Sequence, residues 1–389
     1  MDSYMERIDK RVADELERFA DMAADIHAHP ELGGEEFRTS ALLAGELKSR
    51  GWDVESPYMG LPTAFNAVRR NGDGPLVSFM AEYDALPEIG HACGHNLNGV
   101  MSLLAGIALA DALGDDLRGE IRIVGTPAEE TNGAKVEMSE KGVFDGVDLA
   151  MMAHASAGVA YPAYRSLALV PVEFTFKGLA SHAAASPWDG LNALNGLQLF
   201  FHALDMLRQH VKPDTRIHGV ITKGGDAPNI VPDLAQASFY FRSPNREYLD
   251  KVLEKVYNCA RGAALCTGTE VSRRHHETSF REILPNPEAE RAMAKVLDEL
   301  GIPYSSEPRF SGSTDVGDVS WRCPTLHIHM PFTDKNMALH TREFAAVTGD
   351  RGKTVKGISN GARAIARMGL LALTDEEFKR KTREDFEKK

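Results

Sequence analysis

The segment ALVPVEFTFKG, residues 168–178, decides the fold, because the pattern of the chain changes there. We predict that this segment is a strand. A long helix is predicted next, within residues 186–210, with Ser186 as its N-cap and Pro187 in its first turn. Two strands, a helix and a last strand follow, at residues 216–225, 236–243, 245–266 and 269–277. This β-α-β-β-α-β order predicts a ferredoxin-like α+β domain over residues 167–279.

The segments on both sides of this domain follow a different pattern. Short apolar runs at residues 76–85, 120–130 and 147–156 alternate with helical stretches at 97–113 and 134–142. Strands of this kind, separated by helices, predict an α/β domain with a mixed, mostly parallel sheet and helices on both faces. The pattern resumes with a helix at 287–300, a strand at 325–330 and a long helix at about 349–371. We therefore expect residues 1–166 and 280–389 to form one α/β domain, interrupted by the ferredoxin-like insertion.

The composition of the chain argues against nucleic acid and membranes as partners and indicates a cellular location. The chain has 389 residues, with 44 Lys and Arg against 56 Asp and Glu, a net charge of −12. This balance argues against nucleic acid or an anionic membrane as the main partner. The first residues, MDSYMERIDK, lack the apolar stretch of a signal peptide, and no run of about 18 apolar residues predicts a membrane span. The four cysteines have no disulfide spacing, so we expect free thiols and a cytoplasmic protein.

Groups that can bind a metal follow three of the predicted strands. Cys93 and His95 follow the first, Glu129 and Glu130 follow the second, and His154 ends the third. Because the carboxyl ends of parallel strands meet at one edge of a sheet, we expect these side chains to lie close together. A thiolate, imidazoles and carboxylates together suit zinc or another borderline divalent metal. Adjacent glutamates on a tight turn point in different directions, so one can bind metal while the other accepts a proton from water.

Two other functions use the same residues. Cys93 could be the nucleophile of a thiol hydrolase, with His95 or His91 as its base. Residues two positions apart on a loop rarely face each other well, however, and this function leaves His154 and His340 unused. The same fold could also carry a binding protein without catalytic activity. Metal analysis and a chelator distinguish the first alternative from a metalloenzyme, and replacement of Glu129 by Gln distinguishes the second.

The remaining histidines and cysteines are interpreted as structural or exposed. His327 and His329 alternate on one face of a predicted strand, and His91 is at most a neighbour of the site. Cys259 and Cys266 lie seven positions apart on a predicted helix and are expected in the core. The others interpreted in this way are Cys323 in the core, His27 and His29 near a turn, and His202, His210, His218, His275 and His276 on the surface or the inserted domain.

Six motifs in order along the chain resemble the aminoacylase and glutamate-carboxypeptidase family of two-metal peptidases, in its amidohydrolase branch. The resemblance covers nearly the whole chain, and the ordered set is more specific than any one motif. The motifs are EYDALPEIGHACGHNLNG (82–99), GTPAEETNGAKVEMSEKGVFDGVDLAMMAH (125–154), KGLASHAAASPWDGLNALNG (177–196), GGDAPNIVPDLAQASFYFRS (224–243), GSTDVGDVSW (312–321) and ALHTREFA (338–345).

The resemblance implies a role for each residue of the α/β domain that matches these motifs. Glu129 matches the general base of the family, and Asp84 matches an aspartate behind the metal ligands that orients them. Cys93 is expected to bridge two divalent ions, which could be zinc, manganese, cobalt or nickel. The implied metal ligands are Cys93, His95, Glu130, His154 and His340.

The inserted domain is implied to be a lid and a dimerisation domain. His182 matches a histidine that the family presents from the partner subunit to stabilise the oxyanion, and whether it acts in cis or in trans stays open. Asn229 and Arg242 match positions that hold the carboxylate end of the substrate, a task that suits the planar fork of arginine. Residues 312–314, with Ser313 and Thr314, match a loop that lines the pocket.

The implied activity is hydrolysis of an amide bond next to a free carboxylate. Glu129 takes a proton from a water between the metals, the metals and His182 stabilise the oxyanion, and Glu129 passes the proton to the leaving amine. Small N-acyl amino acids, aminobenzoyl-glutamate-type conjugates and dipeptides all fit, and the implied assembly is a homodimer. The branch usually has Asp where this chain has Asn96, which indicates a subgroup and makes transfer of an auxin-conjugate substrate doubtful.

Overall fold

The computed structural model describes residues 1–310 and 312–388. Within them the chain divides into two compact units. The first contains residues 1–165, 283–310 and 315–388, and the second contains residues 166–282 and 312–314. The second unit is thus inserted into the first along the chain, whereas the sequence pattern puts the limits of the insertion at 167 and 279.

A six-stranded sheet in the order β1-β2-β4-β3-β5-β12 forms the centre of the first unit. β3 pairs in parallel with β4 and β5, and β5 pairs in parallel with β12. β1 and β2 add an antiparallel edge, which was not predicted because half or more of their positions are partly exposed. The predicted mixed, mostly parallel sheet is confirmed. Its strands are β1 (Asp53–Glu55), β2 (Phe65–Asn71), β3 (Leu76–Ala81), β4 (Gly119–Gly125), β5 (Leu149–Ser156) and β12 (Thr325–Pro331).

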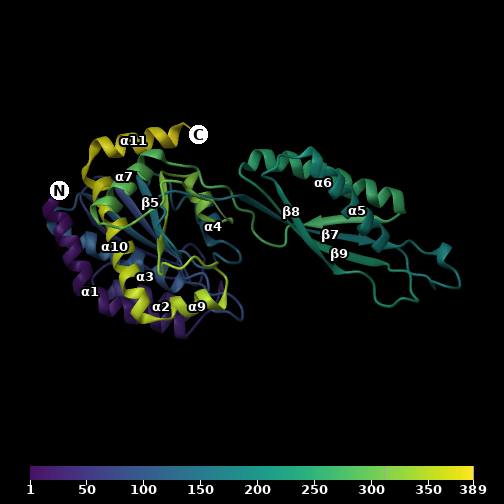
Figure 1. Cartoon of the computed structure of the whole chain (residues 1–389), viewed down its shortest axis with the longest axis horizontal. Helices are drawn as coiled ribbons and strands as arrows, with labels where there is room; N and C mark the ends of the chain where they lie inside the picture. Colours follow the sequence, from purple (N-terminus) through teal and green to yellow (C-terminus); the bar gives the residue numbers. More distant parts are fainter. Residues whose placement is uncertain (311, 389) are drawn as a thin grey trace. The chain divides into compact units, whose positions relative to one another are not determined.

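Helices cover both faces of this sheet. Successive residues of a strand point to opposite faces, and here they pack in two different apolar clusters. Phe79 and Met151 pack in the cluster with α1 (Asp2–Ala28), α3 (His95–Leu113) and α10 (Arg351–Thr374), which are labelled in Figure 1. Met80 and Met152 pack on the opposite face, with α4 (Ala134–Glu140) and α8 (Val316–Ser320). The other elements are α2 (Phe37–Ser49), η1 (Gly114–Asp116), α7 (Pro287–Glu299), α9 (Arg342–Thr348), α11 (Glu376–Glu387) and the short parallel pair β6 (Tyr164–Arg165) and β11 (Arg309–Phe310).

The central helix α3 is apolar around almost its whole circumference. The segment His95–Asp116 is long and apolar enough to cross a membrane by length and composition, which corrects the sequence-based statement that no such run exists. That window is 89% buried inside the structure, as expected for a core helix between a sheet and other helices. Its first residue, His95, lies at the carboxyl edge of the sheet, so the helix presents its N-terminus to the candidate site.

The second unit has a four-stranded antiparallel sheet in the order β10-β7-β9-β8. Helices α5 and α6 pack on one face of it, where Phe174, Phe200 and Phe239 form the centre of the core. This order and connectivity confirm the predicted ferredoxin-like arrangement. The elements are β7 (Ala168–Lys177), η2 (Pro187–Asp189), α5 (Ala193–Leu207), η3 (Arg208–His210), β8 (Arg216–Lys223), β9 (Leu234–Ser243), α6 (Arg246–Thr267) and β10 (Glu270–Arg274).

Two predictions for this unit are wrong. The helix predicted from Ser186 begins at Ala193, where the side chain of Asn192 accepts a hydrogen bond from the backbone N–H of Asn195. Residues 187–189 form only a 3₁₀ turn, because the chain then becomes extended and Leu191 pairs with Leu179. Cys266, predicted in the core, is exposed, since it lies on the outer face of α6.

Candidate metal centre

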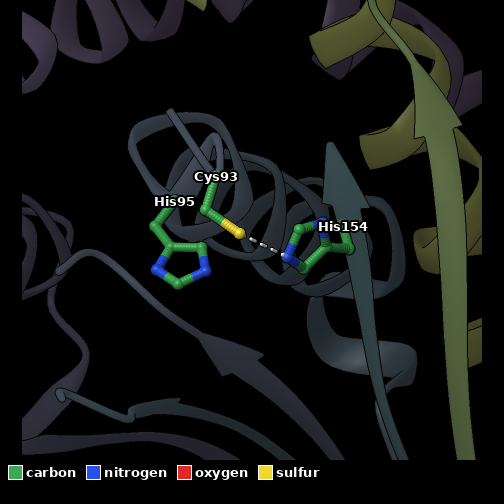
Figure 2. A group of neighbouring side chains, drawn as sticks. All are labelled: Cys93, His95 and His154. Carbon is green, nitrogen blue, oxygen red and sulfur yellow. Dashed lines mark hydrogen bonds between the residues drawn. The ribbon is translucent and has the colours of Figure 1, made fainter. Parts of the chain in front are cut away.

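The predicted ligands of the first unit meet at the carboxyl edge of its sheet. Cys93 precedes α3, His95 begins it, and His154 lies on β5. Figure 2 shows the Cys93 sulfur pointing toward the ring of His154, with the ring of His95 beside it, and the distance from Cys93 Sγ to His154 Nε2 is 3.6 Å. Two segments that are distant in the sequence, residues 93–95 and β5, therefore present a sulfur and two imidazoles to one point.

Gly94 makes the close approach of Cys93 and His95 possible. Its φ of 88° lies in the left-handed region, where residues with a side chain are strained. A Cβ on this residue would also lie 2.6 Å from the Cβ of Ala155 on β5. The turn therefore requires glycine on two grounds, and it lets the residues on both sides of it face the same centre.

Hydrogen bonds orient both imidazoles so that their Nε2 atoms face the centre. The Nδ1–H of His95 donates to Asp84 Oδ1 at 2.9 Å, and the Nδ1–H of His154 donates to the carbonyl of Ala155 at 2.7 Å. Within the described part of the chain, Nε2 of His95 is buried without a hydrogen bond. In metal-binding histidines, one ring nitrogen typically donates to a carboxylate while the other faces the metal. His95 has this arrangement.

His340 approaches the same centre from the distal part of the chain. Its backbone has a φ of 60°, and its N–H donates to the carbonyl of Ala92 at 2.9 Å. This anchor brings His340 Nε2 to 3.2 Å from Glu130 Oε1. The side chain of His340 is 51% exposed, so this corner of the centre is open to solvent.

The donor atoms of the described residues form overlapping groups, and two of these groups share the sulfur of Cys93, while a third contains His95, Glu129 and Glu130. Of the two groups with Cys93, one also contains His95 and His154, and the other also contains Glu130 and His340. In each group the donor atoms lie within 4.8 Å of one another. Sulfur, nitrogen and oxygen donors in this mixture fit a borderline divalent metal, and the buried Nε2 of His95 is a nitrogen that such an ion would satisfy.

The two adjacent glutamates have opposite electrostatic environments. Burial raises the pKa of Glu129 well above its usual value, and the carboxylates of Glu82, Glu130 and Asp315 raise it further. Burial also raises the pKa of Glu130, but the hydrogen bond from His340 and the charge of His95 outweigh burial and lower it to about 2. Two carboxyl groups whose pKa values are driven apart can take different roles, one as an anion and one as a carrier of a proton.

The environment of Cys93 disfavours a nucleophilic role. Burial and the charge of Glu130 raise the pKa of the Cys93 thiol well above its usual range. His95, one candidate base, already has its Nδ1–H on Asp84. The thiol is therefore poorly ionised in the absence of an ion, whereas catalytic cysteines have a lowered pKa.

A buried ion cluster behind the centre was not predicted. The Lys135 ammonium donates to Glu82 Oε1 and to Asp315 Oδ1, both at 2.7 Å, and all three side chains are almost fully buried. Glu82 Oε2 lies 3.6 Å from His95 Nε2, and oxygens of Glu82, Asp315 and Glu129 lie within 4.8 Å of one another. Glu82 and Asp84 are two positions apart after β3, a spacing that puts both on one side of an extended chain and could have identified Glu82. No comparable signal marks Lys135 as buried.

His327 and His329 lie beside the centre but outside the donor groups of the described residues. Both rings are buried on β12, with centroids 5.6 Å and 5.1 Å from that of His154. Burial lowers the pKa of His327 to about 3, so this ring is neutral. These contacts agree with a packing role against His154, and His91 is likewise buried.

The site residues predicted on the insertion belong to the second unit. Nδ1 of His182 accepts hydrogen bonds from the backbone N–H groups of Ala184 and Ala185, so the proton of the neutral ring is on Nε2. The carbonyl of Asn229 accepts from the N–H of Ala183, which makes His182 and Asn229 neighbours across two chain segments.

Arg242 lies on β9 of the same unit. Its Nη1 donates to Ser313 Oγ at 2.9 Å, and its guanidinium lies over the ring of Tyr240. Thr314 is buried in the same short segment. The second unit therefore groups its predicted residues into two pairs, His182 with Asn229 and Arg242 with Ser313. Their roles toward substrate stay predictions.

Comparisons with known proteins agree with this architecture. The Peptidase dimerisation domain matches residues 168–265. The chain is 34% identical over 409 residues to an Xaa-Arg dipeptidase of Mus musculus, covering 97% of this chain and 93% of that protein. It is 30% identical over 439 residues to one of the subunits of the p-aminobenzoyl-glutamate hydrolase of Escherichia coli, covering 94% of this chain and 88% of that protein.

Solved structures show the same fold at lower identity. An aminobenzoyl-glutamate utilization protein from Klebsiella pneumoniae has a TM-score of 0.72 at 19% identity, covering 92% of this chain and 98% of that one. A dinuclear metal-binding peptidase of the M20 family from Bacillus subtilis has a TM-score of 0.65 at 19% identity, covering 92% and 99%. The chain belongs to the M20 family of amidohydrolases and peptidases. It is a metal-dependent hydrolase of amide or peptide bonds.

Proposed function

We propose that the protein hydrolyses the amide bond of a dipeptide or another small N-acyl amino acid, with Glu129 as the general base. The observation that carries this proposal is the position of two adjacent glutamates at the edge of a cluster of sulfur and nitrogen donors. Glu130 is held as an anion beside His340, whereas the environment of Glu129 favours holding a proton. A hydrolase needs both kinds of carboxyl group, one to bind metal and one to move a proton.

The cofactor we propose is a pair of divalent ions, zinc or alternatively manganese, cobalt or nickel. Cys93, His95, Glu130, His154 and His340 would hold these ions. Such ions lower the pKa of a coordinated water and polarise the carbonyl of the substrate. Asp84 keeps His95 in the tautomer that presents Nε2, and its second oxygen accepts from the N–H of Glu130 at 2.9 Å.

The proton path that we propose uses Glu129 twice. Its carboxylate takes a proton from the attacking water and then gives this proton to the amine that leaves. A raised pKa suits the second step, because the protonated acid must survive long enough to be donated. His182 would stabilise the oxyanion through its Nε2–H, a donor that remains available because Nδ1 is an acceptor for Ala184 and Ala185.

We propose that Arg242 and Asn229 bind the carboxylate of the substrate, in a pocket lined by Ser313 and Thr314. The guanidinium of Arg242 can pair with a carboxylate in two places, which selects substrates with a free carboxyl group. Among such substrates, dipeptides with a C-terminal arginine come first, because a relative with that activity is 34% identical over almost the whole chain. Aminobenzoyl-glutamate comes second.

The proposed assembly is a homodimer formed through the second unit, in the cytoplasm. β8 is an edge strand with most of its positions exposed, including Val220 and Ile221. Leu199 and Met206 expose further apolar surface on α5. An exposed edge strand with apolar side chains is a surface that pairing with a second copy would cover. Sedimentation equilibrium tests this assembly.

A hydrolysis screen tests the proposed function. Protein freed of metal by a chelator is incubated with Xaa-Arg dipeptides, N-acyl amino acids and aminobenzoyl-glutamate, each with zinc, manganese, cobalt or nickel. The same amides with an amidated carboxyl end are the matched controls. We expect hydrolysis only with metal and only of amides with a free carboxylate, and two equivalents of metal per chain.

Two other results would contradict the proposal. Full turnover by metal-free protein, abolished by alkylation of one thiol, would identify Cys93 as the nucleophile. Binding of these compounds without turnover under any metal would identify a binding protein.

A further inference from the structure

The turn that carries Glu129 and Glu130 begins with a backbone conformation that few residues adopt. Ala128 has a φ of 59°, in the left-handed region that disfavours a residue with a Cβ. This residue directly precedes the proposed base, so its conformation sets the direction of the Glu129 peptide. Such a conformation persists only when the surrounding structure holds it.

Glu36 holds Ala128 in this conformation. The side chain of Glu36 is fully buried at the start of α2, and its Oε1 accepts the backbone N–H of Ala128 at 2.7 Å. Its Oε2 accepts the N–H of Gly34 and the hydroxyl of Thr63, both at 2.8 Å. The carboxylate is thus fixed by two contacts and offers its other oxygen to the strained peptide.

The loop before α2 also packs directly on this turn. A Cβ on Gly33 would lie 2.5 Å from Thr131 Oγ1 and 3.0 Å from the Cα of Ala128. The loop and the turn are therefore in close backbone contact, and no side chain larger than that of glycine fits between them. This contact places Glu36 within reach of the N–H of Ala128 although the two residues are 92 positions apart.

The far side of the turn is fixed by a second buried carboxylate. Asp84 Oδ2 accepts the N–H of Glu130, and the carbonyl of Ala128 accepts the N–H of Gly133 at 2.7 Å. A buried acid therefore holds the backbone on each side of Glu129, Glu36 through the N–H of Ala128 and Asp84 through the N–H of Glu130. Asp84 also touches a proposed metal ligand, His95, whereas the hydrogen bonds of the Glu36 carboxylate within the described residues go to Gly34, Thr63 and Ala128.

We propose that Glu36 is a positioning residue for hydrolysis: its carboxylate stabilises the left-handed backbone of Ala128 and thereby directs the side chain of Glu129 toward the reacting water. Glu36 acts only through this backbone. The inference rests on the proposed role of Glu129 as the base. Loss of the Glu36 acceptor lets Ala128 relax to an unstrained conformation, which turns Glu129 away while the metal ligands from other segments stay in place.

The test combines Glu36→Gln with Ala128→Gly. The amide of glutamine has one accepting oxygen, so it cannot accept from both backbone N–H groups that the carboxylate binds, those of Ala128 and Gly34. We expect Glu36→Gln to lower kcat by about 10–100-fold, as for other residues that orient a site through its supporting contacts, with a much smaller change in KM. Glycine adopts a positive φ without strain, so Ala128→Gly in the Glu36→Gln background is expected to restore most of kcat. Thr63→Val is the comparison variant, because it removes one hydrogen bond of Glu36 and leaves the acceptor of the Ala128 N–H in place, so its kcat is expected to fall less than that of Glu36→Gln.

Metal affinity and thermal unfolding are measured on all variants as readouts independent of turnover. The apo proteins are titrated with zinc against a chelating dye, and we expect Glu36→Gln to retain most of its zinc affinity. If Glu36→Gln does not fold, Glu36→Asp takes its place, since it keeps the buried charge but shortens the reach to Ala128. A wild-type kcat in the Glu36 variant, or a low kcat that Ala128→Gly leaves unchanged, would overturn the inference.

A parallel Glu129→Gln variant separates this inference from the proposed function. Turnover by Glu129→Gln would show that the proposed base is wrong, whatever the Glu36 variants do. An inactive Glu129→Gln beside a fully active Glu36→Gln would leave the base in place and overturn only the role of Glu36.

Discussion

Replacing Lys135 by Met should destabilise the first unit strongly, because it leaves two buried acids without their cation. The ammonium contacts Glu82 and Asp315 at 2.7 Å each, and none of the three side chains is more than 1% exposed. Burial lowers the pKa of Lys135, but the charges of Asp315 and Glu82 outweigh burial and raise it, so the lysine is charged. Removing one partner of a buried ion pair costs about 3–5 kcal/mol.

The predicted cost is large enough to measure by calorimetry of the metal-free protein. At about 2–4 °C per kcal/mol for a unit of this size, the transition of the first unit should fall by on the order of 6–20 °C. Lys141→Met is the matched control, since Lys141 lies just after the same helix and pairs with Glu137, with 39% and 48% of the two side chains exposed. Such a surface pair contributes less than about 1 kcal/mol.

A second variant separates charge from packing. Lys135→Met combined with Asp315→Asn removes one of the two uncompensated acids, so it should recover part of the lost stability. A transition of Lys135→Met within about 2 °C of the wild type would refute the reasoning, because a shift that small corresponds to about 1 kcal/mol or less. A double variant less stable than the single one would show that packing, and not charge, is the cause.

Three further predictions concern metal, substrate and pH. Cys93→Ala should lower metal stoichiometry below that of the wild type by elemental analysis, and unchanged stoichiometry would remove Cys93 from the ligand set. Arg242→Lys should raise KM about 10–100-fold with a smaller change in kcat, because one charged hydrogen bond to the carboxylate is lost; an unchanged KM would contradict this role. Burial raises the pKa of the Asp9 carboxyl, but the hydrogen bonds from Arg363 and Arg367 outweigh burial and lower this pKa. The ionised carboxylate therefore stabilises the fold at a pH above the pKa of the unfolded chain, and this stabilisation is lost as the pH falls through the folded pKa. Asp9→Asn should therefore lower the melting temperature more at pH 7 than at about pH 3, and an equal loss at both values would refute it.

Much of the fold follows from local pattern in the sequence. The strands β3, β4 and β5 are apolar through most of their length, and each ends in residues that face one edge of the sheet. The strands of the second unit could be predicted because buried and partly exposed residues alternate along them, as in β9, where every second residue is buried. The start of α5 was misread, because the pairing of Leu191 with Leu179 is a long-range contact that no local signal predicts.

Cys93, His95, Glu129, Glu130 and His154 were candidates because they follow or end predicted strands, whereas His340 was implied only by the family motif. The residues that support them could not be predicted. Lys135 looks like a solvated helix residue, and only the tertiary positions of Glu82 and Asp315 make it a buried cation. The contact of Glu36 with Ala128 joins segments 92 positions apart and depends on a backbone angle. Such contacts form only in the folded chain, and no periodic pattern in the sequence predicts them.

Turnover and metal content of Glu129→Gln test the central claim most directly. The amide keeps the size of the side chain but cannot accept the proton, and the predicted metal ligands remain in place. The account predicts two metal equivalents, substrate binding close to that of the wild type, and a kcat lower by on the order of 10²–10⁴-fold or more. Glu137→Gln, at an exposed position of α4, should retain full activity. Turnover by Glu129→Gln at the wild-type rate, with its metal intact, would contradict the account.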